Sequence, residues 1–277
     1  MATAKVHDNS FLTAVPNEAK SIAVILLNNS IDSGILDSSS LLPGVLRQST
    51  LTVCADGGAN QLFDCATDAQ RKLYVPHAIK GDLDSLRSDV HAYYAAENVA
   101  IIRDPDQDTN DLEKCLRHVA ENLPAADATV VVWGAFGGRF DQEMASFAAL
   151  FKHENTFDRI VLLDDANFAE LLSIGENLVR INSRVMGPIC GLIPIGGDVD
   201  VWSDGLKWNL NGGRLSFKGL VSSSNEFVKV RKKVLTCGGQ EGQGRGGEGG
   251  GGDFISISVA LTPTFAAALH CNRMKCQ

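Results

Sequence analysis

The stretch from Ile79 to Asp111 holds two acidic segments, I-K-G-D-L-D-S at residues 79–85 and R-D-P-D-Q-D-T-N-D at residues 103–111. Carboxylates held close together repel one another, and a hard divalent cation such as Mg²⁺ relieves that repulsion. Asp82 and Asp84 follow a β-type run and lie two residues apart, so in extended backbone their side chains point the same way. The second acidic segment directly precedes a helical pattern. The stretch therefore predicts a cation site where strands end and helices begin.

Length and composition are those of a globular protein. The chain has 277 residues, of which 44% are hydrophobic and 21% charged, and this is enough for two modest domains or one large one. A net charge of −8 argues against nucleic acid or an anionic membrane as the main partner. Seven cysteines without a C-x-x-C pair favour reduced thiols over a disulfide framework or a zinc site. With no apolar run of membrane-span length, we expect a cytoplasmic protein.

Residues 21–175 alternate apolar runs with helical patterns. Continuous apolar runs are typical of parallel strands that are buried on both faces. We expect an α/β domain with an open, mostly parallel, Rossmann-like sheet whose ligand lies across the carboxyl edge, and a short helix ending at Leu172. The predicted strands are Ser21–Leu27, Leu51–Ala55, Tyr74–Lys80, Val99–Ile102, Ala128–Trp133 and Ile160–Leu163.

Glycine-rich loops follow two of these strands, at Asp56–Asn60 and at residues 134–142. Glycines between a strand and a helix let backbone amides approach a phosphate, although they also simply permit tight turns. Arg139 is a candidate phosphate ligand because its planar fork can hold two oxygens, but a surface arginine on a loop fits equally well.

A helix is expected from Asp111 onward, where apolar residues recur at helical spacing. Asn110 and Glu113 have the spacing of a capping box. Asp108 or Asp111 could therefore be helix-start residues rather than ligands.

After residue 175 the pattern changes to short strand-like runs separated by turns, which predicts an all-β sandwich domain at residues 176–277. Residues 1–20 are expected to form a loose arm. Residues 238–252 contain ten glycines and are predicted to be a flexible insertion. The predicted strands are Leu178–Ile181, Cys190–Pro194, Val199–Trp202, Arg214–Phe217, Phe227–Val234 and Phe254–Ala260.

Several motifs in both predicted domains resemble those of the eukaryotic thiamine pyrophosphokinases. They are V-C-A-D-G-G-A-N (53–60), I-K-G-D-L-D-S (79–85), D-P-D-Q-D-T-N-D-L-E-K-C-L (104–116), G-G-R-F-D-Q-E-M-A-S (137–146), C-G-L-I-P-I-G (190–196), and G-L-K-W-N-L (205–210) followed by L-V-S-S-S-N (220–225). The resemblance implies transfer of a pyrophosphoryl group from ATP to the hydroxyethyl oxygen of thiamine, with Mg²⁺ required. It also implies a homodimer whose active site is shared between subunits.

The resemblance also implies roles for individual residues. Trp208 would stack on the rings of thiamine, and Asp82, Asp84 and Asp108 would bind the metal. The catalytic set is Asp56, Asp82, Asp84, Asp108, Asp111 and Asp141. The ATP and phosphate ligands are Gly57, Gly58, Gly81, Gly137, Gly138 and Arg139. The thiamine ligands are Gln107, Trp208, Ser222, Ser223, Ser224 and Asn225.

The sequence departs from the family pattern at two places. Asn110 stands where the family usually has threonine, which puts a hydroxyl contact at that position in doubt, and the glycine tract lengthens a hairpin that the family keeps short. Two other functions stay open. A glycosyltransferase could use Asp82-Leu83-Asp84 as its metal motif, but this would not explain the second acidic segment. A non-catalytic thiamine- or nucleotide-binding protein would be favoured by the loss of an acidic position.

Overall fold

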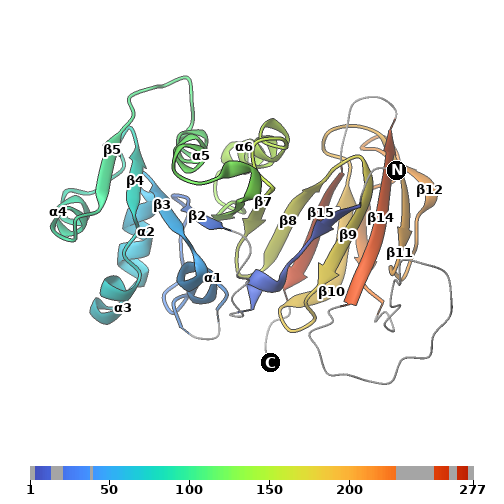
Figure 1. Ribbon diagram of the computed structural model, residues 1–277, viewed down its shortest axis with the longest axis horizontal. Helices are drawn as coiled ribbons and strands as arrows, with labels where there is room; N and C mark the ends of the chain where they lie inside the picture. The colour runs from blue at the N-terminus through green and yellow to red at the C-terminus, as the bar shows by residue number, and fades with distance from the viewer. Residues whose placement is uncertain (1–3, 14–20, 38–39, 229–252, 262–266, 274–277) are drawn as a thin grey trace.

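The computed structural model describes residues 4–13, 21–37, 40–228, 253–261 and 267–273. Its elements form an α/β part and a β-rich part that lie side by side along the long axis of the molecule (Figure 1). The predicted fold class, a mostly parallel α/β sheet followed by a β-rich portion, is confirmed. The glycine tract at residues 238–252 lies outside the described residues.

A ten-stranded sheet runs through both parts, in the order β13-β10-β15-β8-β7-β6-β2-β3-β4-β5. The six strands from β7 to β5 in that order are parallel to one another, and the other four pair antiparallel. The parallel strands are β2 (Ile22–Leu26), β3 (Leu51–Ala55), β4 (Ala78–Gly81), β5 (Ala100–Arg103), β6 (Thr129–Trp133) and β7 (Arg159–Leu163). The remaining strands are β8 (Asn167–Leu172), β10 (Met186–Ile193), β13 (Ser222–Glu226) and β15 (Ala267–Arg273).

Helices cover both faces of the parallel strands. Side chains of β2 alternate between the two cores: Val24 and Leu26 belong to one hydrophobic cluster, and Ala23 and Ile25 to the other. This explains why the strand is a continuous apolar run. The helices are α1 (Leu42–Gln48), α2 (Gly58–Cys65), α3 (Asp68–Leu73), α4 (Ser88–Ala96), α5 (Asp111–Asn122) and α6 (Phe140–Lys152), with short 3₁₀ turns η1 (Ser10–Leu12) and η2 (Ala125–Asp127).

A second sheet of five strands packs in the β-rich part, in the order β1-β9-β14-β11-β12. Its strands are β1 (Lys5–His7), β9 (Gly175–Ile181), β11 (Val199–Asp204), β12 (Asn211–Leu215) and β14 (Asp253–Leu261). Val179, Val201 and Ile257 of this sheet are buried in the same hydrophobic cluster as Val24 and Leu26 of β2. One hydrophobic core is therefore continuous from the α/β part into the β-rich part. The domain boundary at residue 175 stays a prediction.

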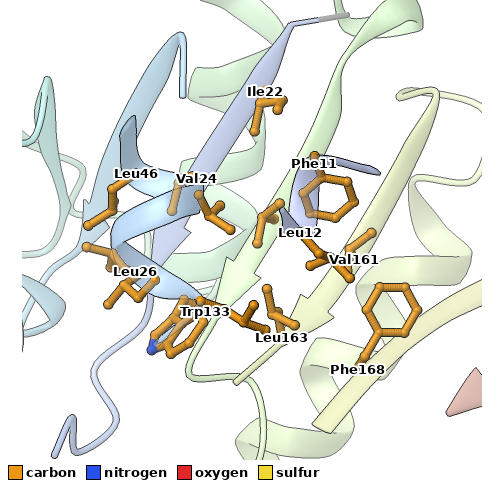
Figure 2. Close-up of a cluster of buried hydrophobic side chains, with 14 of the residues drawn as sticks. Phe11, Leu12, Ile22, Val24, Leu26, Leu46, Trp133, Val161, Leu163 and Phe168 are labelled. Carbon is orange, nitrogen blue, oxygen red and sulfur yellow. The ribbon is translucent and has the colours of Figure 1, made fainter. Parts of the chain in front are cut away.

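The expectation of a loose N-terminal arm is wrong for residues 4–13. Strand β1 pairs with β9 in parallel, and Phe11 and Leu12 of η1 are buried. Figure 2 shows Phe11 and Leu12 beside Val161 in the cluster of buried apolar side chains. Burial of these apolar side chains stabilises the ordered arm.

The short helix expected to end at Leu172 is also wrong, because residues 167–172 form strand β8. This strand pairs antiparallel with β7 on one side and with β15 on the other. Most of its side chains are buried, so pairing on both sides satisfies a backbone that has little access to water. Strand β13 ends at Glu226, and of the strand predicted at Phe227–Val234 only the first two residues are described.

The described part of the chain contains no helix that is both long and apolar enough to cross a membrane.

Candidate active site

Three aspartates from neighbouring strands converge at the carboxyl edge of the sheet. Asp56 follows β3, and Asp82 and Asp84 follow β4, which is the parallel neighbour of β3. One carboxylate oxygen from each residue lies within 4.8 Å of those of the other two. The sequence predicted Asp82 and Asp84 as metal ligands, and the structure places Asp56 with them.

Asp56 is buried, with 2% of its surface exposed, and has a backbone φ of +43°. Its Oδ2 accepts a hydrogen bond from the Ser85 backbone at 3.1 Å, whereas its Oδ1 is buried without any hydrogen-bond partner among the residues that the structure describes. Burial raises the pKa of Asp56 to about 6; the Ser85 hydrogen bond opposes this rise, and the nearby carboxylates, Asp111 first, add to it. A buried carboxylate oxygen that accepts no hydrogen bond from a described residue, such as Oδ1 of Asp56, is suited to bind a cation.

The second acidic segment joins the first through Gln107, whose Nε2 donates to Oδ2 of Asp82 at 3.0 Å. This hydrogen bond is the largest cause of a lowered pKa at Asp82. Asp108 and Asp111 line the same cavity as Asp82, but Asp108 is not in the group of three aspartates defined above. Gln107 therefore lies beside a proposed metal ligand, Asp82. The resemblance, in contrast, implied that Gln107 contacts thiamine.

Asp111 is the first residue of α5, and Asn110 caps that helix by accepting a hydrogen bond from the Glu113 backbone at 2.9 Å. This is half of the predicted capping box, because the Glu113 carboxylate instead contacts Lys152, the last residue of α6, and His153, which follows it. Burial raises the pKa of Asp111, and the hydrogen bond from Lys114 opposes the rise. Asp111 thus both starts the helix and lines the cavity.

The predicted phosphate glycines divide into two groups. Gly137 and Gly138 line the cavity with φ angles of +74° and +70°, which favour glycine. Gly57, Gly58 and Gly81 instead permit close packing. A Cβ on Gly81 would lie 2.7 Å from Cβ of Asp56 and 3.1 Å from Oδ1 of Asp111, so this glycine lets the two acidic segments meet.

Arg139 and Asp141 lie at the start of α6, where they form an exposed ion pair with a 3.1 Å hydrogen bond from Nε of Arg139 to Oδ1 of Asp141. Arg139 lines the cavity with its side chain 73% exposed, so its guanidinium is accessible to a ligand. The loop before it is held by Asn29, whose Nδ2 donates to the carbonyl of Phe136 at 2.7 Å.

These segments surround a cavity of about 950 Å³. Its wall contains side chains that sequence reasoning missed, namely Asn28, Asn29 and Ser30 after β2, and Lys114 on α5. The two asparagines could have been predicted as site residues, since they are polar and directly follow the carboxyl end of a predicted central strand. Lys114 had none, because a lysine on an amphipathic helix is typical of a solvent-exposed face.

The predicted thiamine residues of the β-rich part lie elsewhere. Trp208, between β11 and β12, is 54% exposed, and Nζ of Lys207 lies 4.5 Å from its ring centre. Asn225 is buried and hydrogen bonds to the Trp208 backbone, so its amide does not face open solvent. Ser223 and Ser224 are exposed and Ser222 is half-buried. None of these residues lines the 950 Å³ cavity.

The sheet order separates these residues from the acidic cavity. Strand β13, which carries Ser222–Asn225, is seven strand steps away from β3, which ends before Asp56. Neighbouring strands lie about 4.8 Å apart, so the two groups are separated by roughly 34 Å along the sheet. Strand β3 and strand β10, the neighbour of β13, lie in different parts of the molecule in Figure 1. A molecule the size of thiamine cannot span this distance within one chain.

The comparisons with known proteins match both parts of the chain. The thiamin pyrophosphokinase catalytic-domain model matches residues 42–162, and the model of the vitamin B1 binding domain of the same enzyme matches residues 176–237. Thiamine pyrophosphokinase 1 of Oryza sativa subsp. japonica is 36% identical over 243 residues, which cover 79% of this chain and 89% of the relative. The chain belongs to the thiamine pyrophosphokinase family. The resemblance seen in the sequence motifs is thereby confirmed.

Other thiamine pyrophosphokinases agree with this assignment. Thiamine pyrophosphokinase 2 of Arabidopsis thaliana is 34% identical over 246 residues, covering 83% of this chain and 88% of the relative. The crystal structure of yeast thiamin pyrophosphokinase superposes with a TM-score of 0.77 at 24% identity and covers 99% of this chain and 92% of that one. At this identity the likeness supports the fold, and the curated relatives support the enzyme activity.

Proposed function

We propose that this chain transfers the pyrophosphoryl group of ATP to the hydroxyethyl oxygen of thiamine, giving thiamine diphosphate and AMP. The observation that carries the proposal is the convergence of Asp56, Asp82 and Asp84 in a chain that matches both thiamin pyrophosphokinase domains. All six aspartates that the motif resemblance assigns to the catalytic set are present in the sequence, which favours an enzyme over a non-catalytic binding protein. The family assignment likewise disfavours a glycosyltransferase.

Mg²⁺ is part of the proposal. The residues fit a hard cation, because three carboxylates offer oxygens within 4.8 Å of one another and Oδ1 of Asp56 is buried without a partner in the described part of the chain. Asp56, Asp82 and Asp84 would hold the ion, with Asp108 and Asp111 in the same cavity wall. When bound, Mg²⁺ neutralises phosphate charge and orients the phosphate chain.

The protein's own contribution is positioning and charge. The thiamine hydroxyl oxygen attacks the β-phosphorus of ATP, the bond from that phosphorus to the α,β-bridging oxygen breaks, AMP leaves with that oxygen, and the hydroxyl proton is released. Arg139 can place two N–H groups on phosphate oxygens once it leaves Asp141. The backbone amides of Gly137 and Gly138 border the same space. Phosphoryl-type transfer depends mainly on such groups.

A homodimer with a shared active site is also proposed. Trp208 is exposed, and its backbone is hydrogen-bonded to Asn225 of β13, which lies eight strand steps from β4, the strand before Asp82. A second copy would therefore have to bring its Trp208 to the acidic cavity. An exposed indole can stack on the cationic thiazolium of thiamine and gain cation–π attraction. A cytosolic location belongs to the same proposal and is supported by Cys54, Cys65, Cys115 and Cys190, which are buried free thiols.

The direct test is to incubate the purified protein with ATP, Mg²⁺ and thiamine and to separate the products by chromatography. Thiamine diphosphate and AMP in equal amounts are expected. ADP as the nucleotide product would contradict pyrophosphoryl transfer. Binding of both substrates without any product would favour the non-catalytic alternative.

A further inference from the structure

Lys114 is a buried lysine in the wall of the acidic cavity. It lies in the first turns of α5, three residues after Asp111, and its side chain is 2% exposed. It is among the largest fully buried side chains of the described residues. A buried ammonium is costly unless it is paired, so its position at the cavity needs a reason.

The pairing of Lys114 within the chain is incomplete. Its Nζ donates to Oδ1 of Asp111 at 3.2 Å, and this is its one hydrogen bond within the described part of the chain. An ammonium has three N–H groups, so two remain for a ligand or water. Lys114 also helps to lower the pKa values of Asp82 and Asp106, after the larger effects of Gln107 on Asp82 and of Thr109 on Asp106. The ammonium is therefore close to both acidic segments.

Lys114 is a buried positive charge in a cavity wall whose other charged side chains are mostly carboxylates. Among the described residues, six carboxylates and two cations line the cavity, the cations being Lys114 and Arg139. Arg139 is exposed and paired with Asp141. Lys114 is thus the buried cation of this wall, at the end where Asp82 and Asp111 lie. A polyanionic phosphate chain that enters beside these carboxylates needs positive charge on more than one side.

We propose that Lys114 is a substrate-binding residue whose ammonium contacts non-bridging oxygens of the pyrophosphoryl unit, while it keeps its hydrogen bond to Asp111. This inference rests on the proposed function and assigns one contact in it. Lysine binds phosphate as a compact point charge, and burial strengthens the interaction because water screens it less. Because the contact is to the transferred unit, Lys114 should distinguish ATP from AMP.

Lys80 provides a matched control. It is also a buried lysine, on β4, with Nζ 3.7 Å from Oδ2 of Asp104, but it does not line the cavity. Replacement of either lysine by methionine removes one buried charge and preserves most of the side-chain volume. A general effect of removing a buried charge should appear in both Lys114→Met and Lys80→Met, whereas loss of a phosphate contact should appear only in Lys114→Met.

The experiment measures binding by titration calorimetry with Mg²⁺ present, using α,β-methylene-ATP, which cannot release AMP, and AMP itself. We expect Lys114→Met to bind α,β-methylene-ATP about ten- to hundredfold more weakly, the range for a charged hydrogen bond, and AMP about as wild type does. Lys80→Met should bind both as wild type does. If Lys114→Met does not fold, as judged by its melting curve, Lys114→Gln replaces it.

A second measurement separates a phosphate contact from mere support of Asp111. Mn²⁺ binding without nucleotide, followed by electron paramagnetic resonance, should become tighter in Lys114→Met because a repelling cation has been removed. Weaker Mn²⁺ binding, or equal losses for AMP and α,β-methylene-ATP, would overturn the inference. Unchanged binding of α,β-methylene-ATP by Lys114→Met would also overturn the inference. If the wild-type protein makes thiamine diphosphate, the proposed function would still stand in that case. A wild-type protein that makes no thiamine diphosphate would reject both.

Discussion

The side-chain amide of Asn225 forms hydrogen bonds with both the backbone N–H and the backbone carbonyl of Trp208. Its Oδ1 accepts a hydrogen bond from the Trp208 N–H at 3.1 Å, and its Nδ2 donates to the Trp208 carbonyl at 2.7 Å. Asn225 is buried, whereas the indole of Trp208 is 54% exposed. The structure thus orders the backbone of an exposed aromatic residue, which is the arrangement expected of a ligand platform rather than of a core side chain.

Trp208→Ala should raise the KM for thiamine about five- to thirtyfold, the range for a cation–π contact of roughly 1–2 kcal/mol, and leave the KM for ATP nearly unchanged. Steady-state kinetics with each substrate varied in turn will measure both. Trp202→Ala is the control, because Trp202 is 46% exposed on β11 of the same hairpin. An equal rise in both KM values for Trp208→Ala would show that the indole does not act on thiamine alone.

Asp82→Asn and Asp84→Asn should each lower kcat by about 100-fold or more, because each removes one charge from the proposed Mg²⁺ ligands. Both side chains are exposed enough that no core cavity results, so the melting temperature should stay close to that of wild type. Asp68→Asn, at an exposed aspartate on α3, is the control and should be fully active. Near-normal turnover of either variant at saturating Mg²⁺ would refute the assignment of the metal ligands.

Gly81→Ala should weaken Mn²⁺ binding and lower activity, because the new Cβ would lie 2.7 Å from Cβ of Asp56 and 3.1 Å from Oδ1 of Asp111 and would push the first acidic segment away from both. Gly44→Ala is the matched control: its Cβ would meet nothing within 4 Å, and Gly44 lies inside helix α1, where alanine is favoured by about 1 kcal/mol. Electron paramagnetic resonance of bound Mn²⁺ compares the two. Wild-type affinity in Gly81→Ala would mean that the acidic segments can separate without loss.

Glu170 predicts a pH dependence of stability. Its Oε2 lies 2.9 Å from Nδ1 of His7 and 3.0 Å from Nη1 of Arg159. Burial opposes the charged form, but His7 and Arg159 outweigh it and lower the pKa of Glu170 to about 2. Since the unfolded value is about 4.5, the stabilisation is fully present above pH 4.5 and is lost as the pH falls from 4.5 toward 2.

The magnitude at neutral pH is about 3 kcal/mol. Urea unfolding of Glu170→Gln should therefore show a stability lowered by roughly that amount at pH 7 and a smaller difference from wild type at pH 3. Glu176→Gln, at an exposed glutamate on β9, should match wild type at both values. A difference that is the same at pH 3 and pH 7 would show that the ionised carboxylate is not what stabilises the fold.

The sequence predicted those elements whose pattern is local. The strands β2, β3 and β6 are continuous apolar runs because helices bury both of their faces, and that burial is visible in the residues themselves. Strand β8 was mistaken for a helix because its conformation depends on pairing with β7 and with β15, which is about a hundred residues away in the sequence. Strand β1 is ordered for the same kind of reason, through its distant partner β9.

The site shows the same division. Asp82 and Asp84 could be predicted because both directly follow one strand, although the extended backbone expected between them is wrong, since Leu83 has a φ of +67°. The contribution of Asp56 depends on β3 lying next to β4, and the burial of Lys114 depends on how α5 packs over the end of β4. Neither the pairing of β3 with β4 nor the packing of α5 on β4 can be predicted from the order of residues within one short segment. Residue spacing therefore identified the acidic segments, and the sheet order decided which carboxylates meet.

The most direct test of a site shared by two chains is to mix Asp82→Asn chains with Trp208→Ala chains under conditions that let subunits exchange. The proposed arrangement places Asp82 of one chain opposite the Trp208 position of its partner, so a mixed dimer has one site with both changes and one site with neither. With thiamine held well below its wild-type KM, where Trp208→Ala chains are slow, thiamine diphosphate formation should therefore rise above that of either variant alone. Activity that does not recover, despite exchange demonstrated by native mass spectrometry, would place each site within a single chain and contradict the account.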